Sequence, residues 1–462
     1  MIDKKQVLLC MLLISTSIKP ALTKTKHSTS KHSSKHKQSL ITTTTQVGTY
    51  PGSLDGSFGN GQGIVISKRG QLFGVATQAN NNIVVAGDDI HPSSMVAYAV
   101  EINKLDEDIY LAGSVNNDFA VARLNSAGTL DNSFGGSTTG LAITSFGANT
   151  TSQAHAIALD VNNNNNSAIV VGGFAQTAGN KKFALARYRI DNGALVWKTN
   201  ISPFTQNNPL EQINGVAIDQ QSRIVVAGQT VINDQQRFVL ARYNITNGAL
   251  DTSFGNQGRI VANFGSINQN DTAQAVSINL QNQIIAAGFA QSPSQEALPV
   301  ALFYSDGTLD ASFGQSREGR RCFALASYNN QGQPNNNFGT YIGTELTPIG
   351  TSANEGNALA LYITGPNAGK IVVAGVTTTV LSKSKTAIAC FAIARYDVNG
   401  QLDTTFGDSD GNGQRTGTVI TSFNAENALA TGVTIDSNNK IVVVGYVMHN
   451  GVPHMALARY NS

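Results

Sequence analysis

Residues 224–264 read IVVAGQTVINDQQRFVLARYNITNGALDTSFGNQGRIVANF, and this stretch decides the fold. It holds a β-branched run that ends in Ala-Gly, an alternating apolar run FVLARY, the turn sequence NITNGALDTSFG and a second β-branched run RIVANF. Runs of this kind, separated by Asn, Asp and Gly, are typical of short antiparallel strands joined by tight turns. The stretch therefore predicts three consecutive strands of one antiparallel sheet.

The first of these runs recurs along the chain. Seven copies of five residues begin with Ile and end with Gly, at Ile83, Ile109, Ile169, Ile224, Ile284, Ile371 and Ile441. Successive copies start 26, 60, 55, 60, 87 and 70 residues apart. An alternating strand with an Asn- or Asp-rich turn precedes each copy, as in AHAIALDVNNNNN, and an FVLARY-like strand follows at Phe119, Phe183, Phe238, Leu298, Phe323, Phe391 and Met455. The repeating unit is therefore four antiparallel strands.

Four strands repeated about seven times predict an all-β fold, a β-propeller of about seven four-stranded blades, with six or eight as alternatives. The high content of Ala, Gly and Val fits blades whose inner strands are covered on both faces. Two intervals are irregular. Between Gly87 and Ile109 there is room for a first strand at 96–103 but for no third or fourth strand. Between Gly288 and Ile371 there is an additional third strand, CFALASY, and a piece that resembles a fourth strand, TYIGTEL.

The two ends of the repeated region complement each other. The chain ends in HMALARYNS, where the other units continue into Leu-Asp-x-Ser-Phe-Gly, and residues 52–67 supply that continuation as GSLDGSFGNGQGIVIS. An open ring would leave unpaired strand edges. We therefore expect residues 64–66 to pair with the strand at 455–460 as the fourth strand of the last blade, and Arg459 to pair with Asp55.

The combined phrase IVVAG…FALARYN..G.LD.SFG..G resembles the delta-60 repeat, also known as a domain-of-unknown-function β-propeller repeat of bacterial secreted and surface proteins. The resemblance covers residues 50–460. It implies a propeller in an exported bacterial protein, and it offers no catalytic residues that could be transferred to this chain.

The region before the repeats is different in composition. Residues 1–23 combine Lys4 and Lys5 with the short apolar run VLLCMLLI, which predicts an export signal rather than a membrane span. Residues 24–48 predict a flexible linker rich in Lys, His, Ser and Thr, and residues 49–462 the propeller. We therefore expect the protein to be secreted, periplasmic or attached to the cell surface, without a membrane span, and to be a monomer.

Charge argues against nucleic acid as a partner. Residues 1–46 hold eight Lys and one Asp, a net charge of +7, whereas the whole chain carries +2. The folded part therefore carries −5 and is mildly acidic, unlike a protein that binds phosphate backbones.

An Arg in the third strand and an Asp in the following turn recur together, and they allow two interpretations. The carboxylates could form a ring that binds cations, or each Asp could hold the end of its strand to the turn while it accepts backbone N–H groups. We favour the structural interpretation, because catalysis rarely needs one copy per repeat. The expected pairs are Arg123 with Asp131, Arg242 with Asp251, Arg395 with Asp403 and, across the two ends, Arg459 with Asp55.

The sequence GDSDGNGQRTG at 407–417 is a candidate calcium loop. Asp408, Asp410 and Asn412 occupy alternate positions, Gly413 permits a sharp turn, and Gln414 offers a backbone carbonyl; calcium prefers six to eight such oxygens. Val419 stands where an EF-hand has its bidentate Glu, so an EF-hand is excluded. A plain turn without metal is the alternative. No other cofactor is indicated.

Catalytic motifs are scarce. The sequence has no G-x-S-x-G, no H-E-x-x-H and no phosphate-binding loop. Cys322 and Cys390 precede equivalent strands of neighbouring units, which favours two buried free thiols, although a bridge is left open. Polar residues at the starts of first strands could converge on the mouth of a central channel and form a ligand site, or could be solvated strand ends; they are His155, Glu355, Asn357, Glu426 and Asn427.

Two functions follow from these patterns. The favoured one is a non-enzymatic binding or interaction scaffold for an unknown protein or glycan, because the units are nearly identical and lack catalytic motifs. The alternative is a propeller enzyme that acts on a glycan or small metabolite at the channel mouth. The enzyme hypothesis predicts that His155, Glu355 and Glu426 converge.

Overall fold

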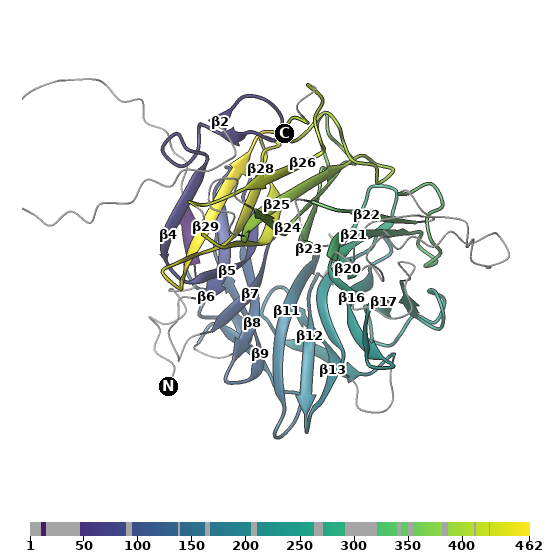
Figure 1. The fold of residues 1–462 in the computed structure, drawn as a ribbon. Coiled ribbons are helices and arrows are strands. Elements are labelled where there is room, and N and C mark those ends of the chain that lie inside the picture. The colour runs from purple at the N-terminus through teal and green to yellow at the C-terminus, as the bar shows by residue number, and fades with distance from the viewer. Residues whose placement is uncertain are drawn as a thin grey trace, which may run out of the picture.

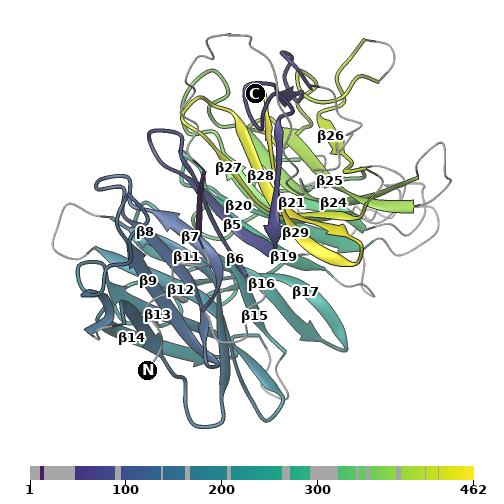
Figure 2. The same cartoon turned by 90° about the vertical axis from the view of Figure 1, so that its left-hand side faces the viewer.

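The computed structural model describes residues 11–14, 47–88, 95–136, 139–161, 167–204, 210–262, 271–291, 321–339, 343–349, 354–380, 387–410, 413–424 and 426–462. Within these residues the chain forms a β-propeller whose sheets follow one another around an axis (Figures 1 and 2). In the second to sixth sheets the strands run outward in chain order, because consecutive strands follow one another along the chain and pair side by side.

The first three sheets are built from residues before 202. The first contains β5 (Gln71–Thr77) and β6 (Ile83–Asp88), with β1 (Met11–Ile14) paired antiparallel to the other side of β6. The second contains β7 (Val96–Ile102), β8 (Ile109–Val115), β9 (Asp118–Leu124) and β10 (Leu141–Thr144). The third contains β11 (Thr151–Asp160), β12 (Ala168–Thr177), β13 (Asn180–Arg189) and β14 (Leu195–Ile201).

The next three sheets repeat this order. The fourth contains β15 (Gln212–Ile218), β16 (Arg223–Ile232), β17 (Gln235–Asn244) and β18 (Arg259–Val261). The fifth contains β19 (Thr272–Ile278), β20 (Ile284–Gln291), β21 (Arg321–Tyr328) and β22 (Thr344–Thr347). The sixth contains β23 (Asn354–Leu361), β24 (Ile371–Val380), β25 (Ala387–Tyr396) and β26 (Thr418–Thr421).

The last sheet combines both ends of the repeated region. It contains β27 (Ala428–Ile435), β28 (Ile441–His449) and β29 (Val452–Tyr460), and β29 pairs antiparallel with β4 (Ile64–Arg69). The short strand β3 (Leu54–Asp55) pairs antiparallel with the end of β29, and β2 (Val47–Gly48) pairs parallel with β3. The innermost strands β5, β7, β11, β15, β19, β23 and β27 contact one another in that order, and β27 contacts β5, so the series returns to its start.

The expected number of complete blades is corrected by the structure. Six of the described sheets have four or more strands, and the first sheet has three, so the prediction of seven four-stranded blades is wrong and the alternative of six complete blades holds. The reason is the short interval after β6: β6 ends at Asp88 and β7 begins at Val96, which leaves too few residues for two further strands. The CFALASY and TYIGTEL segments form β21 and β22, the third and fourth strands of the fifth sheet, while the third strand predicted at Leu298 lies outside the described residues.

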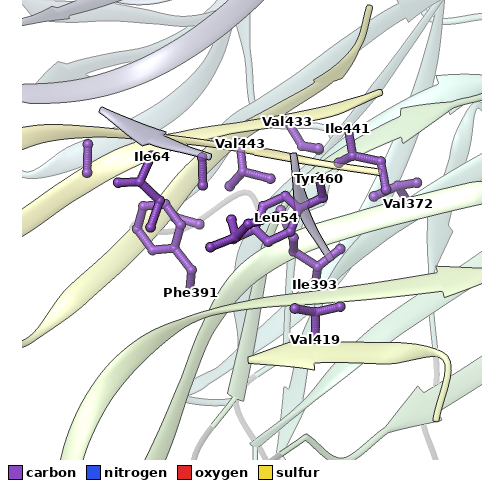
Figure 3. Close-up of a cluster of buried hydrophobic side chains, with 14 of the residues drawn as sticks. Leu54, Ile64, Val372, Phe391, Ile393, Val419, Val433, Ile441, Val443 and Tyr460 are labelled. Atoms are coloured by element: carbon purple, nitrogen blue, oxygen red, sulfur yellow. The ribbon is translucent and has the colours of Figure 1, made fainter. Parts of the chain in front are cut away.

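The pairing across the two ends has the predicted partners. Ala458 lies opposite Ile64, Leu457 opposite Val65 and Ala456 opposite Ile66 (the purple strand beside the yellow strand in Figure 1). Figure 3 shows what this pairing encloses: Leu54 and Ile64 lie among Val443, Tyr460 and side chains of the sixth sheet. Burying an aliphatic or aromatic side chain of this size contributes about 1.5–3 kcal/mol each, so the N-terminal strands add substantially to this core.

The repeated Leu-Asp-x-Ser/Thr-Phe-Gly turn is explained by its contacts. In the sixth sheet Arg395 Nε donates to Asp403 Oδ2 at 2.8 Å, and Thr405 N donates to Asp403 Oδ1 at 3.0 Å. The Arg395 guanidinium lies 4.4 Å from the centre of the buried Phe406 ring. The same ion pair and the same cation–π contact occur at Arg123, Arg242 and Arg459 with Asp131, Asp251 and Asp55, respectively. The four predicted pairs are therefore present, and Ser327 with Asn335 forms the neutral counterpart at 3.3 Å.

The Phe-Gly pair of this turn also joins neighbouring sheets. Gly135 N donates to Asn192 O of the third sheet at 2.9 Å, and a Cβ added to Gly193, whose φ is +72°, would lie 2.8 Å from the Phe134 ring. Gly339 N donates in the same way to Asn399 O at 2.6 Å. Only a glycine combines the left-handed backbone with this close approach, which explains the glycines at Gly193, Gly332 and Gly400 in the turns of the following sheets.

Candidate functional site

Each innermost strand carries one extra residue relative to its neighbour in the sheet. The pairing of β11 with β12, for example, shifts between Ala154 and Ala156, and the shift leaves His155 without a partner in the ladder. Equivalent shifts occur in all seven innermost strands. Such β-bulges re-aim a side chain. The seven bulged residues are Phe73, Tyr98, His155, Asn214, Gln274, Asn357 and Thr431.

All seven bulged residues line one cavity of about 310 Å³, which also includes Gln212, Glu355 and Leu429. We call it the central cavity. Because each sheet contributes its bulged side chain, the cavity lies where the seven innermost strands meet. The two sides of the cavity differ in chemistry. The first three sheets supply aromatic rings, and the other four supply mainly amide, carboxylate and hydroxyl groups.

The aromatic side of the cavity is a continuous row of rings. The Phe73 and Tyr98 ring centres lie 5.3 Å apart, and Tyr98 stacks on His155 at 4.8 Å with planes only 8° apart. The row continues to Phe174, 5.7 Å from His155, and Lys181 Nζ lies 4.0 Å from the centre of the Phe174 ring. Each ring therefore fixes the orientation of the next.

His155 is held in its neutral form. Burial, followed by the nearby Lys181 ammonium, lowers the pKa of His155 to about 4. Its Nε2–H donates to Oε1 of Gln153 at 3.3 Å. At neutral pH the imidazole is thus an uncharged aromatic ring in the row, and protonation would require a charge in a desolvated position.

The polar side is organised by bonds between neighbouring innermost strands. Asn214 Nδ2 donates to Ala273 O at 2.8 Å, and Asn357 Nδ2 donates to Ala430 O at 2.8 Å. Thr431 Oγ1 donates to Leu72 O at 2.5 Å and so connects the seventh sheet to the first. In each case the acceptor is the residue just before the next bulge. These bonds fix the polar side chains in place before any ligand arrives.

Lys181 extends the polar network. Its Nζ donates to Gln212 Oε1 at 2.9 Å, and Gln212 Nε2 donates to Asn214 Oδ1 at 2.7 Å. The ammonium is thus bound both by an amide oxygen and by an aromatic face, and Glu355 supplies a carboxylate elsewhere on the cavity wall.

Three of the five residues predicted for this site are in the cavity, and two are not. His155, Glu355 and Asn357 line it. Glu426 and Asn427 lie outside, because the bulge of β27 is at Thr431; the residue equivalent to Glu355, two positions earlier, is Leu429. The prediction from sequence placed Glu426 and Asn427 in the site because it aligned the innermost strands by their first residues and not by their bulges.

Glu426 and Asn427 make contacts outside the cavity. Glu426 Oε1 lies 2.6 Å from His449 Nδ1, whose side chain is 49% exposed, and Asn427 Oδ1 accepts a bond from Ala389 N at 2.9 Å. Of the three residues that the enzyme hypothesis brings together, His155 and Glu355 line the cavity and Glu426 does not. The cavity residues that the sequence analysis missed are Phe73, Tyr98, Gln212, Asn214, Gln274, Leu429 and Thr431.

The two carboxylates of the candidate calcium loop bind backbone groups. Asp408 Oδ2 accepts from Ile420 N at 3.2 Å, and Asp410 Oδ1 accepts from Gln414 N at 3.1 Å. Burial raises the pKa of Asp408. Asn412 lies outside the described residues, and within those residues no group of three His, Cys, Asp or Glu side chains is placed to hold a metal ion. Calcium binding stays a prediction.

The two cysteines are not bridged. Cys322 and Cys390 are both buried and free. Burial raises the pKa of the Cys390 thiol to about 11, which keeps it protonated and unreactive at neutral pH.

Four segments of the chain match the family model described as "Domain of unknown function (DUF5122) beta-propeller": residues 106–134, 222–254, 369–406 and 437–462. Each spans the second and third strands of a sheet, and the first three include the Asp-x-Ser/Thr-Phe turn. These four segments are similar to the repeat of this family. The resemblance to a domain-of-unknown-function propeller is thereby confirmed.

No curated protein matches the chain. Among solved structures, a luciferin-regenerating enzyme is similar at 9% identity with a TM-score of 0.35, covering 73% of this chain and all of that one. Sqt1 from Chaetomium thermophilum is similar at 10% identity with a TM-score of 0.31, covering 86% of this chain and 97% of that one. The described part of the chain contains no helix with the length and apolar character that a membrane crossing needs.

Proposed function

We propose that this protein is an exported, non-enzymatic binding protein and that its ligand occupies the central cavity. The observation that carries the proposal is the convergence of seven bulged side chains, one per sheet, on a single open cavity. A bulge interrupts the hydrogen-bonded ladder, so seven of them at one level of the propeller are costly unless the re-aimed side chains serve a purpose. Export is proposed from the basic and apolar pattern of residues 1–23.

Binding is favoured over catalysis by the chemistry of the wall. General acid–base catalysis needs a group that can exchange a proton near neutral pH. The pKa of His155 is lowered to about 4, and Glu426, the second carboxylate of the enzyme hypothesis, lies outside the cavity. Among the residues that line the cavity, Glu355 is then left as a single carboxylate without a second acid or base beside it, and the other polar side chains are amides and the hydroxyls of Tyr98 and Thr431, which bind ligands. The propeller acts as a monomeric scaffold, with the cavity as its specific site.

The test is a ligand screen with a blocked variant. A panel that covers sugars, amino acids, nucleosides, organic acids and quaternary amines is added to the full chain, and the shift in melting temperature is measured. We expect one class to stabilise the wild type, and the stabilisation to be lost in Gln274→Phe and in Leu429→Trp, which fill the cavity from two different sheets, the fifth and the seventh. Mass spectrometry of the bound compound should show it unchanged.

Two outcomes would overturn the proposal. If both blocked variants fold and retain the shift, the ligand binds elsewhere. If the recovered compound is chemically converted by the wild type and not by the blocked variants, the cavity is an enzyme active site.

A further inference from the structure

We propose that the ligand class of the central cavity is a neutral six-membered sugar ring, either a free monosaccharide or the terminal residue of a glycan. This inference rests on the proposed function and deepens it. Four properties of the central cavity support it: the row of aromatic rings, the amide side chains opposite that row, the balance of positive and negative charge, and the cavity volume.

The aromatic row offers the surface that a pyranose face needs. The C–H bonds of a sugar ring carry partial positive charge and pack against the electron-rich faces of aromatic rings. Phe73 and Tyr98 are tilted by 44° to each other, and Tyr98 is backed by the parallel ring of His155. The three rings are therefore held in fixed orientations on the cavity wall, where a pyranose ring can pack against them.

The wall opposite the aromatic row can both donate and accept hydrogen bonds. Each sugar hydroxyl both donates and accepts, and an amide side chain does the same. Gln274 makes no side-chain hydrogen bond within the described part of the chain, so its amide is available on the cavity wall. Asn214 and Asn357 each commit their Nδ2 to a backbone carbonyl, which holds those amides in one orientation. Fixed amides beside a carboxylate, Glu355, suit a ligand with several hydroxyl groups.

The charges around the cavity favour an uncharged ligand. Glu355 lies on one part of the wall, and Lys181 approaches the wall through Gln212. The carboxylate and the ammonium balance each other, so the wall has no net charge that would attract a phosphate, a carboxylate or an ammonium ligand. The Lys181 ammonium is already bound by Gln212 Oε1 at 2.9 Å and by the Phe174 face, which reduces its value as an anion partner.

The size of the cavity fits one ring. A volume of about 310 Å³ lies at the lower end of the roughly 300–1,000 Å³ that is usual for small-molecule sites. One sugar ring fills such a space, and a longer glycan would have to extend from the cavity into solvent. Both sources of the ring are therefore compatible with the same site.

The experiment measures binding to the full chain by isothermal titration calorimetry. The probes are glucose, galactose, mannose and N-acetylglucosamine, and a charged set of glucuronic acid, glucosamine and choline. A glycan array compares the free sugars with the same residues at chain ends. We expect at least one neutral sugar to bind, and the charged analogue of that sugar to bind at least tenfold more weakly. A hit on the array and not with the free sugar would assign the glycan end as the source, and the reverse would assign the free sugar.

Variants separate the two walls. Gln274→Ala should weaken binding about tenfold, the effect of one lost hydrogen bond. Tyr98→Leu should abolish measurable binding, and Tyr98→Phe should retain most of it, because stacking is preserved. Gln401→Ala, at an exposed position outside the cavity, is the matched control.

The experiment separates failure of the sugar inference from failure of the proposed binding function. If a nucleoside, amino acid or quaternary amine binds in the cavity and no neutral sugar does, the sugar inference is wrong and the binding function stands. If a sugar binds equally well to Gln274→Ala, to Tyr98→Leu and to the control, its site lies elsewhere and both are wrong.

Discussion

Arg459 Nε donates a hydrogen bond to Asp55 Oδ2 at 2.8 Å, although the two residues lie 404 positions apart in the sequence. Both side chains are less than a tenth exposed. Arg459 also donates to Ser57 Oγ at 2.9 Å and lies over the ring of Phe58 at 4.8 Å. The same set of contacts joins neighbouring parts of the chain in the other units. Here it joins the last strand to the first strands of the propeller.

We expect Asp55→Ala to lower the free energy of unfolding by about 3 kcal/mol or more, because it leaves the buried Arg459 guanidinium without its carboxylate. Asp191→Ala is the matched control: it removes a salt bridge to Arg189 in which the two side chains are 51% and 55% exposed, so the loss of stability should be much smaller than for Asp55→Ala. Urea unfolding monitored by fluorescence measures both. Equal losses would show that Arg459 and Asp55 do not hold the two ends together.

The contact between Phe134 and Gly193 predicts that two glycine-to-alanine variants differ in stability. Gly193→Ala places a methyl group 2.8 Å from the ring and also requires a left-handed alanine at φ +72°. Gly179→Ala has a similar φ of +85° with no atom within 4 Å, so it carries only the backbone cost of about 1–2 kcal/mol. We expect the melting temperature to fall more for Gly193→Ala than for Gly179→Ala. If the two variants melt together, the Phe-Gly contact between sheets is not a packing constraint.

The strands could be predicted from the sequence because each depends on local pattern. The alternating FALAR runs and the β-branched IVVAG runs form the third and second strands, and the pairing of Ile64 with Ala458 followed from the need to close an edge. The short first sheet could also be anticipated from the interval after Gly87, but the number of complete blades could not, because an additional third-strand sequence between Gly288 and Ile371 kept the count of repeats at seven.

The cavity was predicted only in part, because a bulge leaves a weak trace in sequence. His155 and Asn357 stand out as polar residues within apolar strands, whereas Phe73, Tyr98 and Thr431 look like ordinary strand residues. Their common position emerges only from the register shift in each ladder. Aligning the strands by that shift, rather than by their first residue, would have replaced Glu426 with Leu429.

The loop at Asp408 and Asp410 gives a prediction about metal. Addition of calcium to the chelated full chain should raise its melting temperature, because an ion that binds only the folded state stabilises it. Asp410→Ala should abolish this shift. Magnesium serves as the control ion, since it binds reluctantly to loops that must replace its water. An unchanged melting temperature in calcium would establish the loop as a plain turn.

The neutral His155 makes the stability of the protein depend on pH. Its pKa is lowered to about 4 in the folded state from the usual 6.5, so the unfolded chain binds this proton more readily. The contribution is therefore fully present above about pH 6.5 and is lost as the pH falls from there toward 4. We expect His155→Phe, which keeps a ring in the row, to lose less stability than the wild type between pH 7 and pH 4.5 in urea unfolding. Parallel profiles for wild type and His155→Phe would mean that the imidazole is not held in its neutral form by the cavity.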